Sequence, residues 1–125
     1  MATMLIVDDE LDMRMLIRIV IEMANHGLSI VGEAADGEEA IQVWRDLDGP
    51  PVPDVVILDN RMPRLTGLEV AEQILQERPD QLIVLYSSFL DDAVRARAAA
   101  IGITRCVSKQ ELEQLPSLVR ELTSV

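Results

Sequence analysis

The chain has 125 residues, of which 49% are hydrophobic, so we expect one buried core and a single domain over residues 1–125. Its formal net charge of −11 disfavours direct binding to nucleic acid or to an anionic membrane surface, because both would repel it. The single cysteine cannot form an internal disulfide, and neither a signal-peptide pattern nor a segment of membrane-helix length is present, so we expect a cytoplasmic protein.

Short β-prone runs alternate with segments of helical period along the chain. Strands are predicted at 3–7, 28–34, 55–58, 82–87 and 105–108, and helices at 11–24, 37–48, 67–77, 91–101 and 110–122. This order is typical of parallel strands joined by helical crossovers. The third and fourth strands are apolar on both faces, as strands covered by helices on each side are. The sequence therefore predicts an α/β fold built on a doubly wound, five-stranded parallel sheet.

The first predicted helix carries two apolar rows. One recurs at the i, i+3, i+4, i+7 spacing of a face packed on a sheet: Met13, Leu16, Ile17, Val20 and Ala24. The other, formed by Leu11, Met15 and Ile19, falls roughly opposite and is edged by charged residues. We interpret this second row as a docking surface for another helix. The alternative is that these side chains are simply exposed one by one.

Polar residues follow four of the five predicted strands, at the edge where open α/β sheets bind ligands. They are Asp8, Asp9 and Glu10 after the first strand, Asp59 after the third, Ser87 and Ser88 at the end of the fourth, and Lys109 after the fifth. Clustered carboxylates repel one another unless a cation compensates their charge, and Mg²⁺ prefers oxygen ligands. We therefore expect Mg²⁺ as the cofactor, with Asp9 and Asp59 as direct ligands and Asp8 acting through water.

The same group of residues suits phosphoryl transfer. A carboxylate oxygen of Asp59 can attack phosphorus in line, while Lys109 and the Ser87 hydroxyl balance charge on the transferring oxygens. The product is an aspartyl phosphate. Each residue also has an ordinary explanation, such as helix capping by Asp8 or a turn at Asp59. Capping does not easily explain so many functional groups at the ends of four different strands.

Two segments of the chain, MLIVDDE at 4–10 and LDNRMPRLTG at 58–67, have the character of family motifs. The first resembles the opening, and the second the phosphoacceptor loop, of response-regulator receivers of two-component, histidine–aspartate phosphorelay signalling. The resemblance covers essentially the whole chain. It implies a flavodoxin-like (βα)5 fold with strand order 2-1-3-4-5.

The resemblance also implies roles for individual residues. Asp59 would be the phosphoacceptor, Asp8 and Asp9 the acidic pair, and the backbone carbonyl of Arg61 a further Mg²⁺ ligand. Ser87 would be the switch hydroxyl, and Lys109 would pair with the phosphoryl oxygens. The chain would then be a signalling switch rather than an enzyme, because it would catalyse only its own phosphorylation and dephosphorylation.

The partners implied by the resemblance are proteins. The phosphodonor would be a sensor histidine kinase or a histidine phosphotransfer protein, docked through Leu11, Met15 and Ile19. Output would pass through the first helix or through the fourth helix, fifth strand and fifth helix, a surface that would also suit a homodimer. The sequence ends soon after the predicted fifth helix, so we expect no DNA-binding or enzymatic output module within it.

Three positions depart from the family pattern. Cys106 stands where the family commonly has Tyr or Phe, which puts the usual aromatic readout in doubt, and Gln110 follows the lysine where proline is frequent. Phe89 stands at a position that, in the family it resembles, influences water access to the phosphoryl group, so a slowly decaying phosphorylated form is one hypothesis. The other is a loop side chain packed on the fourth helix.

Three rival functions are weighed against the same residues. A phosphorylation-independent docking domain is favoured by Cys106 and disfavoured by the intact Asp9, Asp59 and Lys109. A phosphatase with an aspartate nucleophile normally carries a second aspartate two residues later, where this chain has Arg61. A flavin carrier is disfavoured as well, because acids follow the first strand where a phosphate-binding loop is needed.

Overall fold

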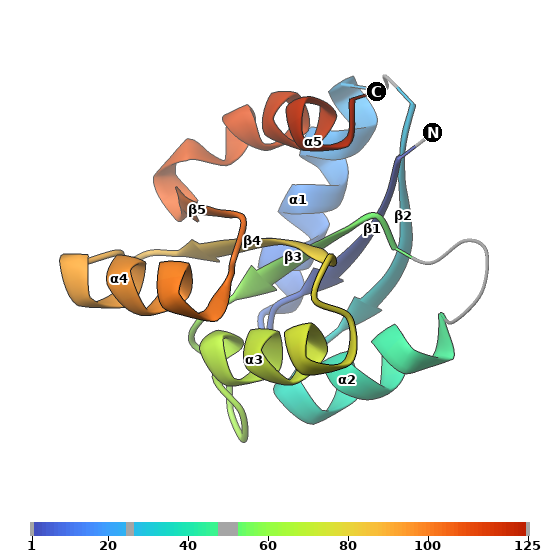
Figure 1. Ribbon diagram of the computed structural model, residues 1–125. Helices are drawn as coiled ribbons and strands as arrows, with labels where there is room; N and C mark the ends of the chain where they lie inside the picture. The colour runs from blue at the N-terminus through green and yellow to red at the C-terminus, as the bar shows by residue number, and fades with distance from the viewer. Residues whose placement is uncertain (1, 25–26, 48–52, 125) are drawn as a thin grey trace.

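The computed structural model describes residues 2–24, 27–47 and 53–124. Within these ranges, five parallel strands form one sheet of order β2-β1-β3-β4-β5 (Figure 1). The strands are β1 Ala2–Val7, β2 Leu28–Ala34, β3 Val55–Asp59, β4 Leu82–Ser87 and β5 Arg105–Ser108. The helices are α1 Leu11–Ala24, α2 Gly37–Asp46, α3 Gly67–Glu77, α4 Asp92–Ile101 and α5 Leu115–Thr123, with a 3₁₀ segment η1 at Lys109–Gln114. The predicted fold class and strand order are confirmed.

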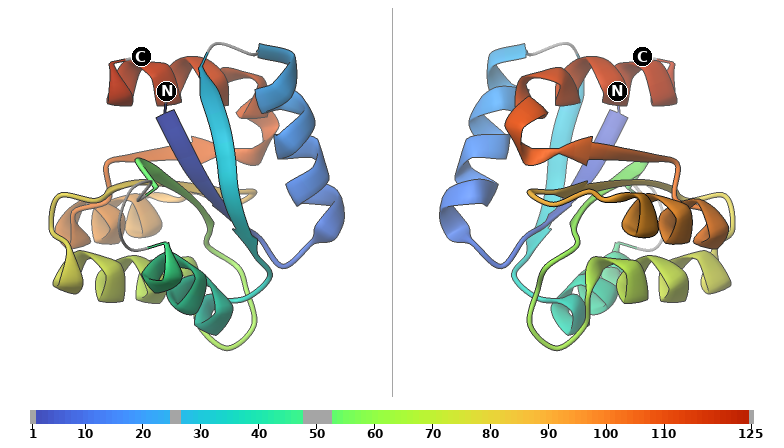
Figure 2. Two further views of the ribbon diagram at one scale, coloured as in Figure 1. Left: turned by 90° about the vertical axis from the view of Figure 1, so that its right-hand side faces the viewer. Right: turned by 90° about the vertical axis from the view of Figure 1, so that its left-hand side faces the viewer.

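Helices cover both faces of the sheet. Figures 1 and 2 show α1 and α5 on one face and α2, α3 and α4 on the other. The first face encloses the α1/α5 core, formed by Ala2, Met4, Ile6, Ile17, Ile21, Val55, Ile57, Val84, Tyr86, Leu112, Leu115 and Val119. The second encloses the α2/α3/α4 core, which includes Leu5, Val7, Trp44, Val56, Leu58, Ile74, Ile83 and Leu85. Alternate residues of β1, β3 and β4 therefore enter opposite cores, as the apolar runs predict.

Polar side chains fix the beginnings of three helices. Asp36 accepts a hydrogen bond from the Glu39 amide at the start of α2, and Thr66 forms a capping box with Glu69 at the start of α3. Asp91 caps α4 from an extended conformation, so this helix begins one residue later than predicted. The predicted end of the second helix at residue 48 lies outside the described residues.

The prediction of one continuous helix at 110–122 is wrong. The chain instead forms the 3₁₀ segment η1 and then begins α5 at Leu115, with Glu111 outside helical geometry at φ −116° and ψ 28°. The physical reason is Pro116, which has no amide hydrogen and whose ring would clash with the carbonyl four residues earlier. A proline is accommodated only in the first turn of a helix, and that is where Pro116 lies.

The predicted buried face of α1 needs one correction. Ile17 and Ile21 are buried, but Leu16 is 44% exposed. At 3.6 residues per turn, Leu16 lies about 120° around the helix from the midpoint of Ile17 and Ile21, too far to reach the sheet. Leu16 therefore adds to the exposed apolar side of α1 rather than to the core.

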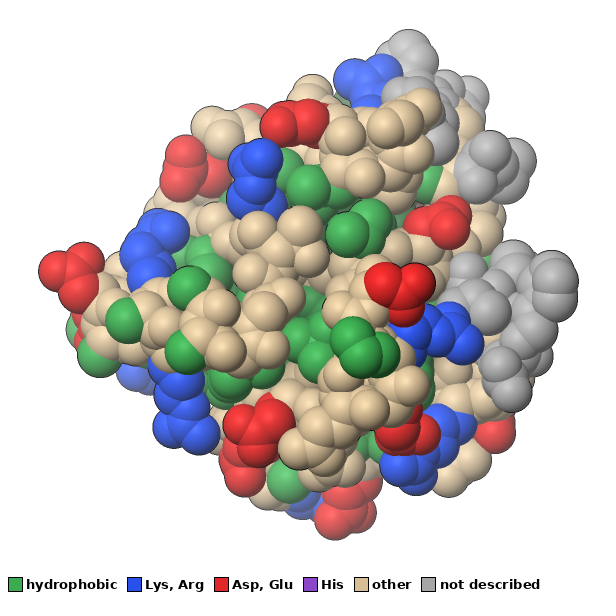
Figure 3. All heavy atoms as spheres, viewed as in Figure 1, with side chains coloured by type: hydrophobic (Ala, Val, Ile, Leu, Met, Phe, Trp, Pro, Cys, Tyr) green, Lys and Arg blue, Asp and Glu red, His purple; other side chains and the backbone are tan. Residues whose placement is uncertain are grey.

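Charged side chains of both signs are spread among apolar and polar ones on the face drawn in Figure 3, without one large patch of a single sign. None of the helices in the described ranges combines the length and the apolarity required to cross a bilayer.

Candidate functional site

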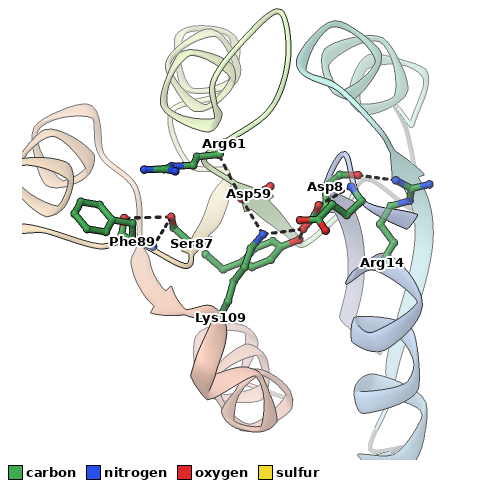
Figure 4. Close-up of polar contacts among 9 residues, drawn as sticks. Asp8, Arg14, Asp59, Arg61, Ser87, Phe89 and Lys109 are labelled. Carbon is green, nitrogen blue, oxygen red and sulfur yellow. Dashed lines mark hydrogen bonds and ion pairs between the residues drawn. The ribbon is translucent and has the colours of Figure 1, made fainter. Parts of the chain in front are cut away.

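Parallel strands end at one edge of the sheet, and strand alternation points three charged side chains to the same side of it. Asp8 continues the phase of Met4 and Ile6, Asp59 that of Ile57, and Lys109 that of Val107, residues that all pack in or on the α1/α5 core. The Lys109 ammonium lies 3.3 Å from Asp8 Oδ2 and 3.3 Å from Asp59 Oδ1 (Figure 4). The structure therefore brings these three predicted site residues together.

The two carboxyl groups at this site are buried, with Asp8 0% and Asp59 2% exposed. Burial, and then the negative charge of Asp8, raise the pKa of Asp59 to about 6, although Lys109 and the Arg61 amide oppose the shift. Burial alone lowers the pKa of Lys109, but Asp59 and Asp8 outweigh it and the net pKa is raised. The site thus holds a protonated amine between two acids and has a shortage of positive charge.

Acidic oxygens continue from Asp8 toward solvent. One carboxylate oxygen from each of Asp8, Asp9 and Glu10 lies within 4.8 Å of the other two, and Asp9 and Glu10 are exposed. The Glu10 amide donates a hydrogen bond to Asp8 Oδ1 at 2.8 Å, which holds that carboxylate in the bend after β1. An all-oxygen donor set with excess negative charge is what a hard divalent cation such as Mg²⁺ requires, so the residues present fit that ion.

The loop after β3 is tied closely to Asp59. The Arg61 amide donates to Asp59 Oδ1 at 3.3 Å, and the Gly67 amide donates to the Asn60 carbonyl at 2.9 Å. A Cβ on Gly67 would lie 2.3 Å from the Asp59 carbonyl oxygen, a distance that no side chain tolerates. The glycine at this position therefore allows the loop to approach Asp59 and brings the Arg61 backbone to the site.

Ser87 belongs to the opposite phase of β4 from the buried Tyr86, and its hydroxyl bonds within the loop that follows. The Phe89 amide donates to Ser87 Oγ at 3.1 Å, and Ser87 Oγ lies 3.2 Å from the Phe89 carbonyl that accepts from it. The Phe89 ring is 57% exposed and lies 5.7 Å from the Arg61 guanidinium carbon (Figure 4). In this state the Ser87 hydroxyl is engaged with the loop rather than with the carboxylates.

Two residues that contact Asp8 were missed from sequence. The Tyr86 hydroxyl donates to Asp8 Oδ2, and burial, followed by Asp8, raises the pKa of Tyr86, so the phenol stays protonated. The Arg14 guanidinium donates to the Asp8 backbone carbonyl at 2.6 Å and to Glu33 at 3.1 Å. The available signal was strand phase: Tyr86 is a polar-tipped residue two positions after Val84, on the face that carries Asp59.

Cys106, the departure from the family pattern, lies in β5 with its side chain partly buried against the α2/α3/α4 core. Burial raises the pKa of its thiol, with Arg95 opposing the shift, so the group is a neutral, compact side chain. Cys106 therefore supplies neither the bulk of the Tyr or Phe that is common at this position in the family nor the hydroxyl of the Tyr.

The family model described as "Response regulator receiver domain" matches residues 4–120. The chain belongs to this family. As a receiver domain of response regulators, it is a component of two-component signal transduction, and the recognition made from the two sequence motifs is confirmed.

Similar proteins include receivers alone and receivers within longer proteins. The chain is 33% identical over 98 residues to the chemotaxis protein CheY of Thermotoga maritima, a match covering 78% of this chain and 77% of CheY. It is 38% identical over 105 residues to a protein-glutamate methylesterase/protein-glutamine glutaminase of Hahella chejuensis, covering 80% of this chain but only 28% of that protein. The receiver therefore spans less than a third of that relative's length.

Solved structures agree with the receiver fold. The response regulator domain of Thermotoga maritima CheB superimposes with a TM-score of 0.87 at 26% identity, covering 99% of this chain and 97% of that one. The five-stranded sheet with order 2-1-3-4-5 is thus the architecture of a known receiver.

Proposed function

We propose that this receiver accepts a phosphoryl group on Asp59 from a histidine-phosphorylated partner, in a reaction that depends on Mg²⁺. The observation that carries the proposal is the Lys109 ammonium, 3.3 Å from each of two buried carboxylates at the carboxyl edge of the sheet. An ion pair of a surface lysine adds little to stability, so stability alone gives little reason for this arrangement. A lysine that pairs with phosphoryl oxygens, in contrast, has to lie beside the acceptor carboxylate.

The metal would be held by Asp9, Asp59 and the backbone carbonyl of Arg61, with Asp8 acting through water. When bound, Mg²⁺ supplies the positive charge that the acidic cluster lacks and that the transferring phosphoryl oxygens need. Lowering the negative field around Asp59 also favours the ionised carboxylate, which is the nucleophilic form.

The protein groups have separate tasks in the transfer. A carboxylate oxygen of Asp59 forms a bond to phosphorus while the bond from phosphorus to the partner's imidazole nitrogen breaks. The Lys109 ammonium pairs with a phosphoryl oxygen in place of one of its carboxylates. The Ser87 hydroxyl leaves Phe89 and donates to another phosphoryl oxygen. Hydrolysis of the aspartyl phosphate later restores Asp59, so the chemistry is confined to the chain's own aspartate.

The assignment of Asp9 is tested by comparison with a nearby acid. Asp9→Ala is expected to weaken Mg²⁺ binding about tenfold and to slow labelling by acetyl phosphate at limiting Mg²⁺, because it removes a ligand. Asp12→Ala removes the same charge from the exposed first turn of α1 and should leave both unchanged. Mg²⁺ affinity from calorimetric titration and the initial labelling rate are the measurements. Equal effects of the two substitutions would show that only net charge matters.

Phe89 supports the proposal of a slowly decaying phosphorylated form. Its ring is exposed, and the ring centroid lies 5.7 Å from the guanidinium carbon of Arg61. The backbone of Phe89 is hydrogen-bonded to the Ser87 hydroxyl. Phe89→Ala is expected to accelerate loss of phosphoryl severalfold, because it opens a path for water, while Phe89→Leu retains most of the bulk and should change the rate less. Decay of the label after removal of phosphodonor measures this. A decay rate unchanged by Phe89→Ala would assign the ring a purely local role.

We also propose that α1 docks the phosphodonor. Leu11, Met15 and Ile19 are 59%, 53% and 50% exposed, so this row is uncovered in the described structure. Arg14 and Arg18 beside it are anchored through Glu33 of β2, and Arg14 also bonds the Asp8 carbonyl. A helix with an exposed apolar row, directly after the acids proposed to hold Mg²⁺, is suited to docking a partner helix that carries a phosphohistidine. A homodimer through α4, β5 and α5 stays a prediction.

Docking and chemistry can be separated by the choice of phosphodonor. Met15→Glu is expected to slow transfer from a phosphorylated histidine phosphotransfer protein about tenfold, because it places a charge at the centre of an apolar contact. Labelling by acetyl phosphate, which needs no docking surface, should be unchanged. Ala100→Glu on the exposed side of α4 is the matched control. Slower labelling from both donors would mean that the substitution disturbs the site itself.

A further inference from the structure

Tyr86 is the residue of β4 that pairs with Asp59, the proposed phosphoacceptor. The β3–β4 pairing places Tyr86 directly opposite Asp59, and neighbouring residues in a parallel pair point to the same face of the sheet. Tyr86 is the only tyrosine in the chain and is fully buried. The Tyr86 side chain therefore lies beside Asp59, on the face of the sheet that is covered by α1 and α5.

The hydroxyl of Tyr86 forms a hydrogen bond with the carboxylate of Asp8. It donates to Asp8 Oδ2, the oxygen that also lies 3.3 Å from the Lys109 ammonium. The other oxygen, Oδ1, accepts from the Glu10 amide at 2.8 Å. Donors from three separate segments thus hold both oxygens of one buried carboxylate, and rotation of that carboxylate would leave buried polar groups without partners.

The ring of Tyr86 supports the ammonium. Lys109 Nζ lies 5.1 Å from the ring centroid, within the range of a cation–π interaction. The same ammonium is 3.3 Å from Asp59 Oδ1. An aliphatic residue in β4 would fill the same core space but would offer neither the hydroxyl to Asp8 nor a ring face to Lys109.

We propose that Tyr86 is a positioning residue of the receiver site. Its hydroxyl orients the Asp8 carboxylate for its water-mediated part in holding Mg²⁺, and its ring holds the Lys109 ammonium between the two acids. The inference rests on the function proposed above and adds a residue that the recognised motifs do not contain. The hydroxyl and the ring of Tyr86 make separate contributions, and one substitution tests each of them.

Tyr86→Phe removes the hydroxyl and keeps the ring. Mg²⁺ titration of the unphosphorylated protein, followed by NMR amide shifts, should show an affinity about tenfold lower than wild type, as expected when the partner of a metal-binding carboxylate is lost. Val84→Ala is the matched control, since Val84 is buried in the same strand and on the same face. It should lower the thermal midpoint but leave Mg²⁺ affinity at the wild-type value.

Tyr86→Leu removes the ring as well. At saturating Mg²⁺, Tyr86→Phe should regain the wild-type rate of labelling by acetyl phosphate, whereas Tyr86→Leu should remain severalfold slower because Lys109 has lost its support. Wild-type Mg²⁺ affinity in Tyr86→Phe, or an equal loss of affinity in Val84→Ala, overturns the inference by reducing Tyr86 to a packing residue. If the wild-type chain itself takes no label, the proposed function fails instead, and the two failures are distinguishable.

Discussion

Asp59→Asn abolishes incorporation of phosphoryl from acetyl phosphate in the presence of Mg²⁺: this is the largest effect we expect on function. The amide is a poor nucleophile, and no other described carboxylate combines burial at the carboxyl edge with contact to Lys109 except Asp8, whose two oxygens are already held by donors. Asparagine has the same shape as aspartate, so the fold should be retained.

The control for this experiment is Asp54→Asn. Asp54 precedes the same strand at its opposite end, where it accepts a hydrogen bond from the Thr3 amide at 2.9 Å. Both substitutions remove one negative charge, but only Asp59→Asn should eliminate the label. Circular dichroism of both variants checks that the fold is intact. Persistent labelling of Asp59→Asn, at a rate near that of Asp54→Asn, would show that the acceptor is another residue.

The second large effect concerns stability without metal. Burial and Asp8 raise the pKa of Asp59 from 3.8 to about 6, so between these values the folded state binds a proton that the unfolded state has lost. The free energy of unfolding must then fall as the pH rises through this window, by up to about 3 kcal/mol at about 1.4 kcal/mol per unit. Below the unfolded-state pKa the penalty from Asp59 disappears.

Asp59→Asn should therefore be more stable than wild type at pH 7 in EDTA, by up to about 3 kcal/mol. The gain should shrink as the pH falls from about 6 to about 4, because wild-type Asp59 becomes protonated in the folded state. Urea unfolding at a series of pH values measures the difference. Addition of Mg²⁺ should reduce it, because the cation stabilises the wild-type carboxylate. A destabilised Asp59→Asn protein at pH 7 would mean that the Lys109 contact outweighs the burial of charge.

Strand phase explains how much of the site could be predicted from sequence. Asp8, Asp59 and Lys109 each continue the alternation of a recognisable strand, and parallel strands end at a common edge. Their meeting point therefore followed from the order of the elements without any coordinates. The Gly67 contact is similar, since the glycine ended a recognisable loop motif, although the motif alone does not show that a Cβ there would strike the Asp59 carbonyl.

Features that depend on packing were not accessible in this way. The position of Leu16 is decided by where the sheet meets α1, and a shift of one residue in the helical phase moves it from the core to the surface. The split between η1 and α5 is different, because it has a local cause: Pro116 restricts the backbone more strongly than the helical period of its neighbours favours one helix. In the sequence, Tyr86 is one residue of an apolar strand, and the role of its hydroxyl becomes evident only from the contact with Asp8.

The most direct test of the account is intact-protein mass spectrometry of the wild-type chain after treatment with acetyl phosphate, with and without Mg²⁺, followed by peptide mapping. We predict the addition of one phosphoryl group, located on Asp59, only when Mg²⁺ is present. A chain that stays unmodified, carries the group on another residue, or is modified equally well in EDTA would contradict the assignment of Asp59 as a metal-dependent phosphoacceptor.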